Sequence, residues 1–238
     1  MSRYHRTQGI VLRTYKLGEA DRIVVLLSPD RGMIRGVAKG VRKTKSKFGS
    51  RLEQTSHIAL QIHEGKSELN LITQVETIDY FPQIREDFER LTKAAAMFEA
   101  VDQIALPGEP AESMYKMLLG ALISLEQNDS PLLVAGFFLK LIALEGAKQE
   151  VDYCVICTDR NVVAYSADEG GLLCQNHRKG ISVSEEAVGV LQNILGGELR
   201  KALSLPESAT TKEVANIATK AVEHFLERRI RSMKIFNP

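Results

Sequence analysis

The sequence predicts an α+β multidomain protein, in which a small strand-rich domain precedes an α-helical domain interrupted by a cysteine-containing hairpin. Three observations lead to this prediction. Short segments of alternating apolar and polar residues fill residues 7–78, and such alternation is typical of β-strands. Apolar residues with helical spacing begin after Pro82. All three cysteines of the chain lie between residues 154 and 174, inside the helical part.

The first 80 residues are expected to form one domain of five short strands. Residues 58, 60 and 62 show the alternation most clearly, and the turn Pro29-Asp30-Arg31-Gly32 combines a fixed φ with a permissive glycine. The predicted strands are 7–16, 22–28, 33–39, 56–63 and 68–78. Five short strands with one long connection between the third and the fourth favour a closed barrel of the OB type. A β-sandwich is the alternative.

The remaining residues, 81–238, are expected to form the helical domain. Apolar residues between Ile84 and Phe98 recur at intervals of three and four, as on one face of a helix. Residues 114–125 predict a second helix, and the apolar segment 132–147 predicts a third at the centre of a bundle. Two patterns resemble capping boxes and predict later helices, namely Ser182 with Glu185 and Thr210 with Glu213.

The connection between the third and fourth strands is strongly basic. The sixteen residues 36–51, GVAKGVRKTKSKFGSR, contain six cations and no carboxylate. Such a segment is too charged to form a core, so we expect a solvated loop held between two strands. Residues 1–63 contain 13 Lys and Arg against 4 Asp and Glu, a net charge of +9, whereas the remainder carries −8. This asymmetry indicates a polyanion-binding face at one end of the chain.

The basic loop is therefore predicted to bind the phosphates of nucleic acid. The candidate residues are Lys39, Arg42, Lys43, Lys45, Lys47 and Arg51, with Arg35 beside them. The aromatic residues near the loop are few, with Tyr4, Tyr15 and Phe48 as the candidates for base stacking, so binding should depend mainly on phosphates. A loop that only increases solubility is the alternative.

The cysteine-containing hairpin predicts a structural zinc site. Cys154 and Cys157 form one pair with a two-residue spacer, and Cys174 and His177 form a second pair after sixteen intervening residues. Two such turns can direct three thiolates and one imidazole to the corners of a tetrahedron around Zn²⁺. Four protein ligands leave no open position, so the metal would be structural, in a module over residues 152–180. Three free thiols without a metal are the alternative.

Common catalytic and targeting signals are absent from the sequence. It contains no Walker P-loop, GxGxxG, HExxH or GxSxG motif, and His5, His57, His63 and His224 are scattered. Carboxylates on the helices form no evident catalytic pair. The N-terminus does not resemble a signal peptide, and the apolar run 132–139 is too short to span a bilayer. These features predict a cytoplasmic, non-enzymatic protein with no membrane contact.

Several segments resemble the RecO family of bacterial DNA repair proteins. The resemblance is strongest over residues 7–53, which include GIVLRTYKLGEADRIVVLLSPDRGMIRGVAKGVRKTKSKFGSRLE, and over residues 154–178, which include SADEGGLLC; it continues to LERRIRSMKIF near the end. It implies an N-terminal OB fold, a helical domain and a zinc module. It also implies binding of single- and double-stranded DNA, annealing of complementary strands, and help from RecR in loading RecA onto strands coated with single-strand DNA-binding protein. Such a protein would associate with the nucleoid during repair.

One departure from the family pattern concerns the metal. Zinc-binding members usually close the site with a fourth cysteine, and His177 stands at that position here. Histidine is an ordinary zinc ligand, so the site is still expected. The sequence thus predicts a recombination mediator that neutralises phosphates and catalyses no reaction. The alternative is an RNA-binding or ribosome-associated OB protein without annealing activity, and a metal-dependent enzyme is a more distant one.

Overall fold

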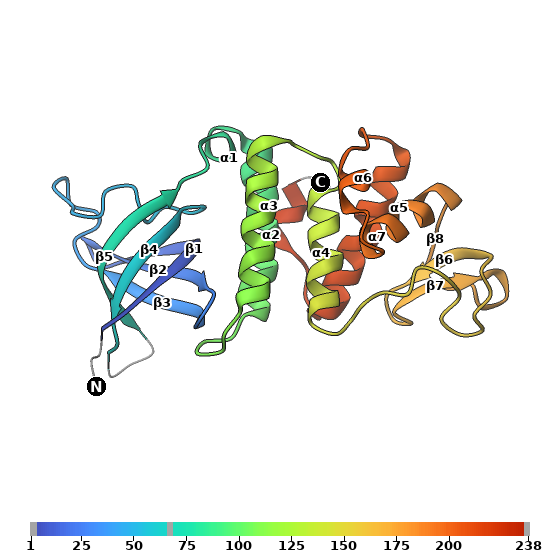
Figure 1. The fold of residues 1–238 in the computed structure, drawn as a ribbon, viewed down its shortest axis with the longest axis horizontal. Coiled ribbons are helices and arrows are strands. Elements are labelled where there is room, and N and C mark those ends of the chain that lie inside the picture. Colours follow the sequence, from blue (N-terminus) through green and yellow to red (C-terminus); the bar gives the residue numbers. More distant parts are fainter. Residues whose placement is uncertain (1–3, 66–68, 236–238) are drawn as a thin grey trace. The chain divides into compact units, whose positions relative to one another are not determined.

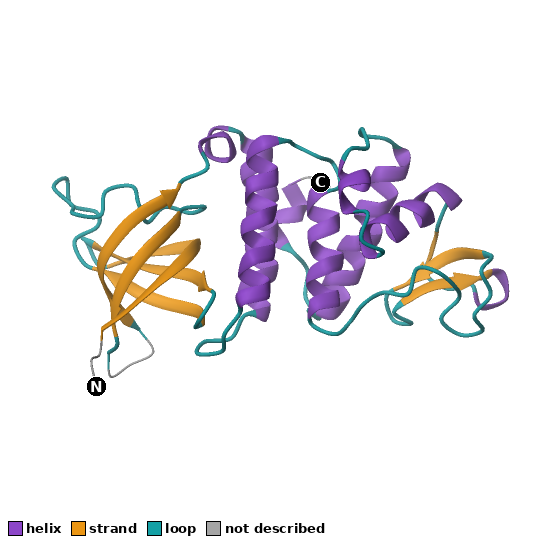
Figure 2. Cartoon of the chain, viewed as in Figure 1, coloured by secondary structure: helices purple, strands orange, loops and turns teal. Residues whose placement is uncertain are grey.

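The fold was analysed in a computed structural model, which describes residues 4–65 and 69–235. The described chain divides into two compact units, 1–126 and 127–238. The first unit consists of the barrel strands and three helices, and the second of the remaining helices and a small sheet (Figures 1 and 2). The division between these units does not coincide with the domain boundary expected between residues 80 and 81, which stays a prediction.

Five antiparallel and parallel pairings close the barrel of the first unit in the order β1-β2-β3-β5-β4. The strands are β1 (Tyr4–Leu17), β2 (Asp21–Ser28), β3 (Gly32–Ala38), β4 (His57–His63) and β5 (Asn70–Asp79). The long strand β1 closes the barrel, because residues 4–10 pair with β4 and residues 10–17 pair with β2. The predicted OB-type barrel is confirmed and the sandwich alternative is wrong. Glu68, the first residue of the predicted fifth strand, lies outside the described residues.

The barrel core includes apolar residues of the basic loop, which the charge pattern of the sequence did not indicate. Val41, Phe48 and Leu52 belong to the same buried core as the strand residues, and Phe48 and Leu52 are 2% and 1% exposed. The basic loop is therefore not a purely solvated segment, since its three apolar residues close one end of the barrel. Their burial anchors the loop and turns its charged side chains to the surface.

Three helices complete the first unit. They are α1 (Pro82–Glu86), α2 (Phe88–Ile104) and α3 (Glu112–Gln127). The single helix expected from residue 84 to residue 98 is interrupted at Asp87, which has extended backbone angles. The Asp87 side chain accepts a hydrogen bond from the backbone N–H of Arg90 at 3.0 Å, so it caps the start of α2.

A buried histidine joins the barrel to α3 within this unit. His57 Nε2 lies 2.6 Å from the Tyr115 hydroxyl oxygen, which also donates to Gln8 Oε1 at 3.3 Å. Burial lowers the pKa of His57 below its usual 6.5, and the nearby Asp79 carboxylate only partly opposes this shift. The folded protein therefore holds His57 neutral at a pH where the unfolded chain is already protonated.

We expect the free energy of unfolding to fall as the pH decreases below about 6.5. The unfolded state then binds the extra proton, which reduces stability by about 1.4 kcal/mol per pH unit until the folded state is also protonated. Urea unfolding at pH 7.5 and pH 5.5 measures this loss, and His57→Asn should remove part of it. An identical pH dependence in the wild type and in this variant would contradict the assignment.

The second unit is a helical bundle that carries the small sheet. Its helices are α4 (Leu133–Leu144), α5 (Glu185–Leu195), α6 (Leu199–Leu203) and α7 (Ala209–Phe225), with short 3-10 turns at Gln175–His177 and Arg231–Ile235. The apolar helix α4 packs against α5, α6 and α7, in agreement with its predicted central place. The sheet consists of β6 (Val162–Ser166), β7 (Gly171–Cys174) and β8 (Ile181–Ser182).

Both predicted capping boxes of the second unit are wrong by two residues. Ser184, and not Ser182, caps α5, because Ser182 pairs within the sheet. Ser208, and not Thr210, caps α7 and exchanges hydrogen bonds with Thr211. Glu213 instead accepts hydrogen bonds from the backbone N–H and hydroxyl of Ser184, both at 2.7 Å, so it links the two helices.

Candidate nucleic-acid interface and metal centre

In the structure the basic loop comprises residues 39–56, because residues 36–38 belong to β3 and β4 begins at His57. The loop is held at both of its ends. Near its start, the backbone N–H of Gly40 donates to Asp21 Oδ1 at 2.8 Å, and that of Arg42 donates to the Ala20 carbonyl at 3.0 Å. At its far end, the Arg85 guanidinium of α1 donates to the hydroxyls of Thr55 and Ser56 at 2.9 and 2.6 Å. Together with the buried apolar residues, these bonds give the loop a defined shape.

The predicted phosphate ligands of the loop are all exposed, but they differ in what they already bind. Three of them donate to backbone carbonyls: Arg42 to Gly18 at 3.2 Å, Lys47 to Thr73 at 3.0 Å, and Arg51 to Lys47 at 3.0 Å. The side chains of Lys39, Lys43 and Lys45 form no ion pair or hydrogen bond with any other described residue. These three ammonium groups are the most available for an anionic partner.

Arg35 lies away from the loop, on the outer face of β3. Its cross-strand partner is Val25, and the next partner along the same row is Arg13 of β1. Arg13 Nη2 forms an ion pair of 2.8 Å with Asp102 Oδ2 of α2. Burial raises the pKa of the Asp102 carboxyl, although the positive charges of Arg13 and Arg35 act in the opposite direction.

Sequence reasoning missed Arg13 because it lies well before the basic run. Only the registers of β1 with β2 and of β2 with β3 place it on the same outer row as Arg35. The structure also removes Phe48 from the stacking candidates, since its ring is buried in the barrel, whereas Tyr4 and Tyr15 are 55% and 44% exposed. Both remaining candidates lie on β1, and the Tyr15 ring is the one in contact with Arg13.

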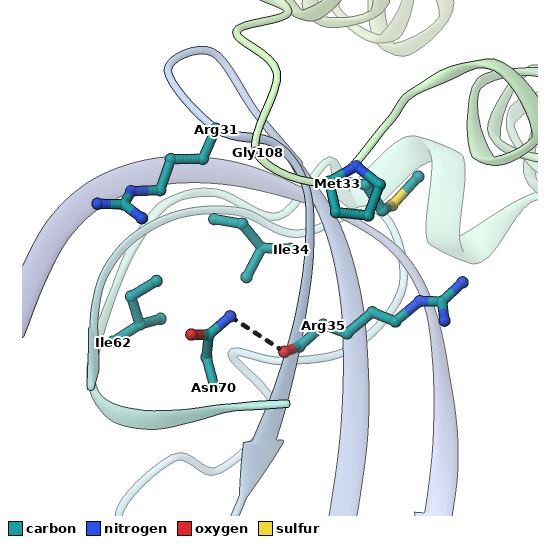
Figure 3. Close-up of a pocket in the computed structure, with 8 residues that line it drawn as sticks. Arg31, Met33, Ile34, Arg35, Ile62, Asn70 and Gly108 are labelled. Atoms are coloured by element: carbon teal, nitrogen blue, oxygen red, sulfur yellow. Dashed lines mark hydrogen bonds between the residues drawn. The ribbon is translucent and has the colours of Figure 1, made fainter. Parts of the chain in front are cut away.

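A cavity of about 230 Å³ opens where β3 and β5 meet (Figure 3). It is lined by Arg31, Met33, Ile34, Arg35, Ile62, Asn70, Pro107 and Gly108. The Asn70 amide donates to the Arg35 carbonyl at 3.4 Å, and the two arginine side chains extend away from each other. Arg31 is paired with Glu64 at 2.5 Å. The polar groups do not converge on one point, so the cavity lacks the arrangement that a catalytic site requires.

The three cysteines and His177 of the second unit converge on one point. Cys154, Cys157, Cys174 and His177 each offer one ligand atom, and these four atoms all lie within 4.8 Å of one another. The distance from His177 Nδ1 is 3.6 Å to Cys154 Sγ and 3.4 Å to Cys174 Sγ, and the Cys157 and Cys174 sulfurs are 3.6 Å apart.

These separations fit a tetrahedral zinc site. Zn–S bonds of about 2.3 Å and Zn–N bonds of about 2.0–2.1 Å imply sulfur–sulfur separations of about 3.8 Å and sulfur–nitrogen separations of about 3.6 Å. A disulfide would need sulfurs about 2.05 Å apart, and the three cysteines are free. The predicted convergence of the two pairs is thus present, with β7 and the following 3-10 turn supplying Cys174 and His177.

The backbone around Cys154 favours a thiolate. Burial disfavours ionisation of this thiol, but hydrogen bonds from the backbone N–H groups of Cys174, Ile156 and Cys157 outweigh it and lower the pKa of Cys154 to about 6. The turn itself is closed by hydrogen bonds from Cys154 N–H to the Asp159 carbonyl and from Thr158 N–H to the Cys154 carbonyl, at 2.7 and 2.9 Å. Thiolates are the form of cysteine that binds metals.

Comparison with known proteins identifies relatives over nearly the whole chain. Residues 1–81 match the family model described as "Recombination protein O N terminal", and residues 85–235 match "Recombination protein O C terminal". Proteins named "DNA repair protein RecO" from Bifidobacterium adolescentis and Frankia casuarinae are 37% and 35% identical to the chain. The alignments cover 98% and 96% of this chain, and 99% and 96% of the relatives. Among the described residues, no helix has the length and apolar character needed to cross a membrane.

Proposed function

We propose a function for this chain, which belongs to the RecO family of DNA repair proteins. The protein is a recombination mediator that binds single- and double-stranded DNA and anneals complementary strands. The observation that carries the proposal is the basic loop on the closed barrel. Its buried Val41, Phe48 and Leu52 fix the backbone. The side chains of Lys39, Lys43 and Lys45 are exposed, and they have no ion-pair or hydrogen-bond partner in the part of the chain that the structure describes.

The proposed mechanism is electrostatic. Two complementary strands repel each other because each carries one negative charge per nucleotide, and a surface of several cations lowers that repulsion when both strands bind it. Phosphates carry no base identity, so this surface serves any sequence. No bond is made or broken by the protein in this scheme. The seven predicted residues, Arg35, Lys39, Arg42, Lys43, Lys45, Lys47 and Arg51, form the proposed DNA surface.

The proposed partners follow from family membership and from the charge division of the chain. A mediator must transfer strands between proteins, and the part of the chain after residue 63 is acidic, with a net charge of −8. That part is a poor DNA surface, so we assign to the helical domain the contacts with RecR, and to the whole protein the loading of RecA onto strands coated with single-strand DNA-binding protein. The proposed cofactor is one structural Zn²⁺ held by Cys154, Cys157, Cys174 and His177.

An annealing assay tests the proposed function. The protein should accelerate annealing of complementary DNA oligonucleotides, naked or coated with single-strand DNA-binding protein, and RecR should increase RecA loading on the coated strands. The acceleration should disappear at high salt, because counterions compete for the phosphates. Tight binding to structured RNA without any annealing of DNA would instead favour the RNA-binding alternative.

A further inference from the structure

The outer face of the barrel near the basic loop is organised in rows across the strands. Directly paired residues of neighbouring strands lie on the same face of a sheet. Tyr15 of β1 pairs with Ile23 of β2, which pairs with Val37 of β3, which pairs with Leu71 of β5. We name these four residues the open row. The adjacent row contains Arg13, Val25 and Arg35.

Burial changes sharply from row to row. Farther from the loop, Ile10, Leu27 and Met33 form a third outer row that is at most 4% exposed, and Val25 of the middle row is 1% exposed. The members of the open row are instead half-buried, apart from Tyr15, which is 44% exposed. The rest of the first unit therefore covers the sheet only as far as the row of Arg13, Val25 and Arg35. The open row beyond it is an accessible apolar strip with one aromatic ring.

Tyr15 is held in place by a chain of contacts from α2. The guanidinium carbon of Arg13 lies 5.1 Å from the centroid of the Tyr15 ring, within the range of a cation–π interaction. Arg13 is in turn fixed by its 2.8 Å ion pair with Asp102, whose side chain is only 13% exposed. A helix residue therefore orients the arginine, and the arginine restrains the ring.

The surroundings of the open row are positively charged. Arg13 and Arg35 stand at the two ends of the adjacent row. The turn that follows β1 contacts the basic loop, since the Arg42 backbone N–H and guanidinium donate to the carbonyls of Ala20 and Gly18. Tyr15 lies three residues before Gly18, so the ring and the proposed phosphate ligands are at the same end of the barrel. An apolar strip bordered by cations is complementary to bases attached to a phosphate backbone.

We propose that Tyr15 is a nucleobase-stacking residue for single-stranded DNA, on a floor formed by Ile23, Val37 and Leu71, and that Asp102 acts through Arg13 as its positioning residue. This inference rests on the proposed function and gives it a preference for single strands. Bases in a duplex are already stacked and paired, whereas bases of a single strand are free to stack on the ring. The same row continues around the closed barrel to Tyr4, because Leu71 pairs with His63 and His63 pairs with Tyr4, whose ring lies 4.8 Å from that of His63. We assign the stacking to Tyr15 because Arg13 holds its ring and the turn after β1 joins it to the basic loop.

The test compares Tyr15→Ala with Tyr15→Phe and Tyr80→Ala. Loss of one stacked base should weaken binding to a single-stranded oligonucleotide by about tenfold. The salt dependence of that affinity and the affinity for duplex DNA should stay unchanged, because the phosphate ligands are intact. Tyr15→Phe keeps the ring, and Tyr80→Ala removes an exposed tyrosine that follows the end of β5 opposite Leu71, so both should bind as the wild type does. Oligonucleotides with 5-iododeoxyuridine should photocrosslink to Tyr15.

Asp102→Asn tests the positioning role, since it keeps the size of the side chain and removes its charge. It should lower the crosslinking yield at Tyr15 by about threefold without changing duplex affinity. Equal single-strand affinity of Tyr15→Ala and the wild type would overturn the stacking proposal, as would crosslinks that map only to Tyr4. A wild-type protein that binds no DNA would instead refute the proposed function itself, so the two failures are distinguishable.

Discussion

Reversal of three charges in the basic loop, Arg42→Glu, Lys43→Glu and Lys45→Glu together, is expected to weaken binding of single-stranded DNA by roughly 500-fold at 50 mM salt. Each phosphate contact on a single strand contributes about −0.7 to the slope of log affinity against log salt, so three lost contacts flatten the slope by about 2. Over the range from 50 mM to about 1 M, where the electrostatic contributions vanish, that difference amounts to the stated factor. Annealing should fall with affinity.

The loop geometry makes this variant informative. The Lys43 and Lys45 side chains have no ion-pair or hydrogen-bond partner among the described residues, and the Arg42 guanidinium gives up one hydrogen bond to the Gly18 carbonyl, so little folding energy is lost. The apolar anchors Val41, Phe48 and Leu52 remain in the barrel. Fluorescence anisotropy with several unrelated oligonucleotides at four salt concentrations measures both affinity and slope. The loss should be similar for all sequences, because the contacts are to phosphates.

A matched control distinguishes the effect of the loop charges from the effect of the net charge of the protein. Lys148, Lys201 and Lys220 are exposed lysines of the second unit, and their reversal to glutamate changes the net charge of the protein by the same amount. That control should keep most of the affinity and the slope. If the loop variant stays folded and binds with wild-type affinity and slope, or if the control loses as much, the basic loop is not the DNA surface.

The barrel itself was predictable because strand alternation and turn residues are local signals. Ile58, Leu60 and Ile62 alternate, and all three face the core as expected. The role of the basic loop in the core was not predictable in the same way. Its six cations dominate the composition of residues 36–51, and the apolar residues 41, 48 and 52 follow neither a period of two nor one of 3.6. Their place in the core is evident only in the folded barrel, where these three residues close one end of it.

The other features that the sequence did not predict depend mostly on contacts between residues distant in the sequence. Nothing in the sequence around Arg13 connects it to Arg35 or Asp102, because the row that joins them depends on the register of three strands and the position of α2. The helix starts were misplaced for a similar reason. Ser182 and Thr210 have suitable acidic residues three positions later, but Ser182 is recruited by β6, and Glu213 contacts Ser184. The cysteine cluster was easier to predict, because each pair of ligands is separated by only two residues and a local turn brings the two side chains together.

Removal of the proposed zinc ion is expected to destabilise the second unit by several kcal/mol. Apparent free energies of zinc binding in small structural sites are about 10–16 kcal/mol at pH 7, and such binding energy becomes folding energy when the site exists only in the folded chain. Cys154 and Cys174 are at most 1% exposed, and their sulfurs would lie buried and unliganded without the ion. A chelator should therefore lower the thermal unfolding temperature, and added Zn²⁺ should restore it.

Variants of the four ligands test which residues hold the ion. Cys154→Ser should reduce the metal content, measured by mass spectrometry of protein purified without chelators, from about one zinc per chain to well below that value. His177→Ala should do the same, whereas His224→Ala removes an exposed histidine outside the cluster and should change neither metal content nor stability. DNA affinity should remain close to that of the wild type, because the phosphate ligands belong to the first unit.

His177→Cys gives the most specific test of the cluster. The distances of 3.6 and 3.4 Å from His177 Nδ1 to the sulfurs of Cys154 and Cys174 place this side chain at the fourth corner of the site. A thiolate at that corner can also bind zinc, so the variant should keep about one zinc per chain and resist chelators at least as well as the wild type. A wild-type protein with well under one zinc per chain, or a His177→Ala variant with unchanged zinc content and thermal stability, would contradict the four-ligand site. In the second case His177 would only pack beside the cysteines, and the metal would depend on the three thiolates alone.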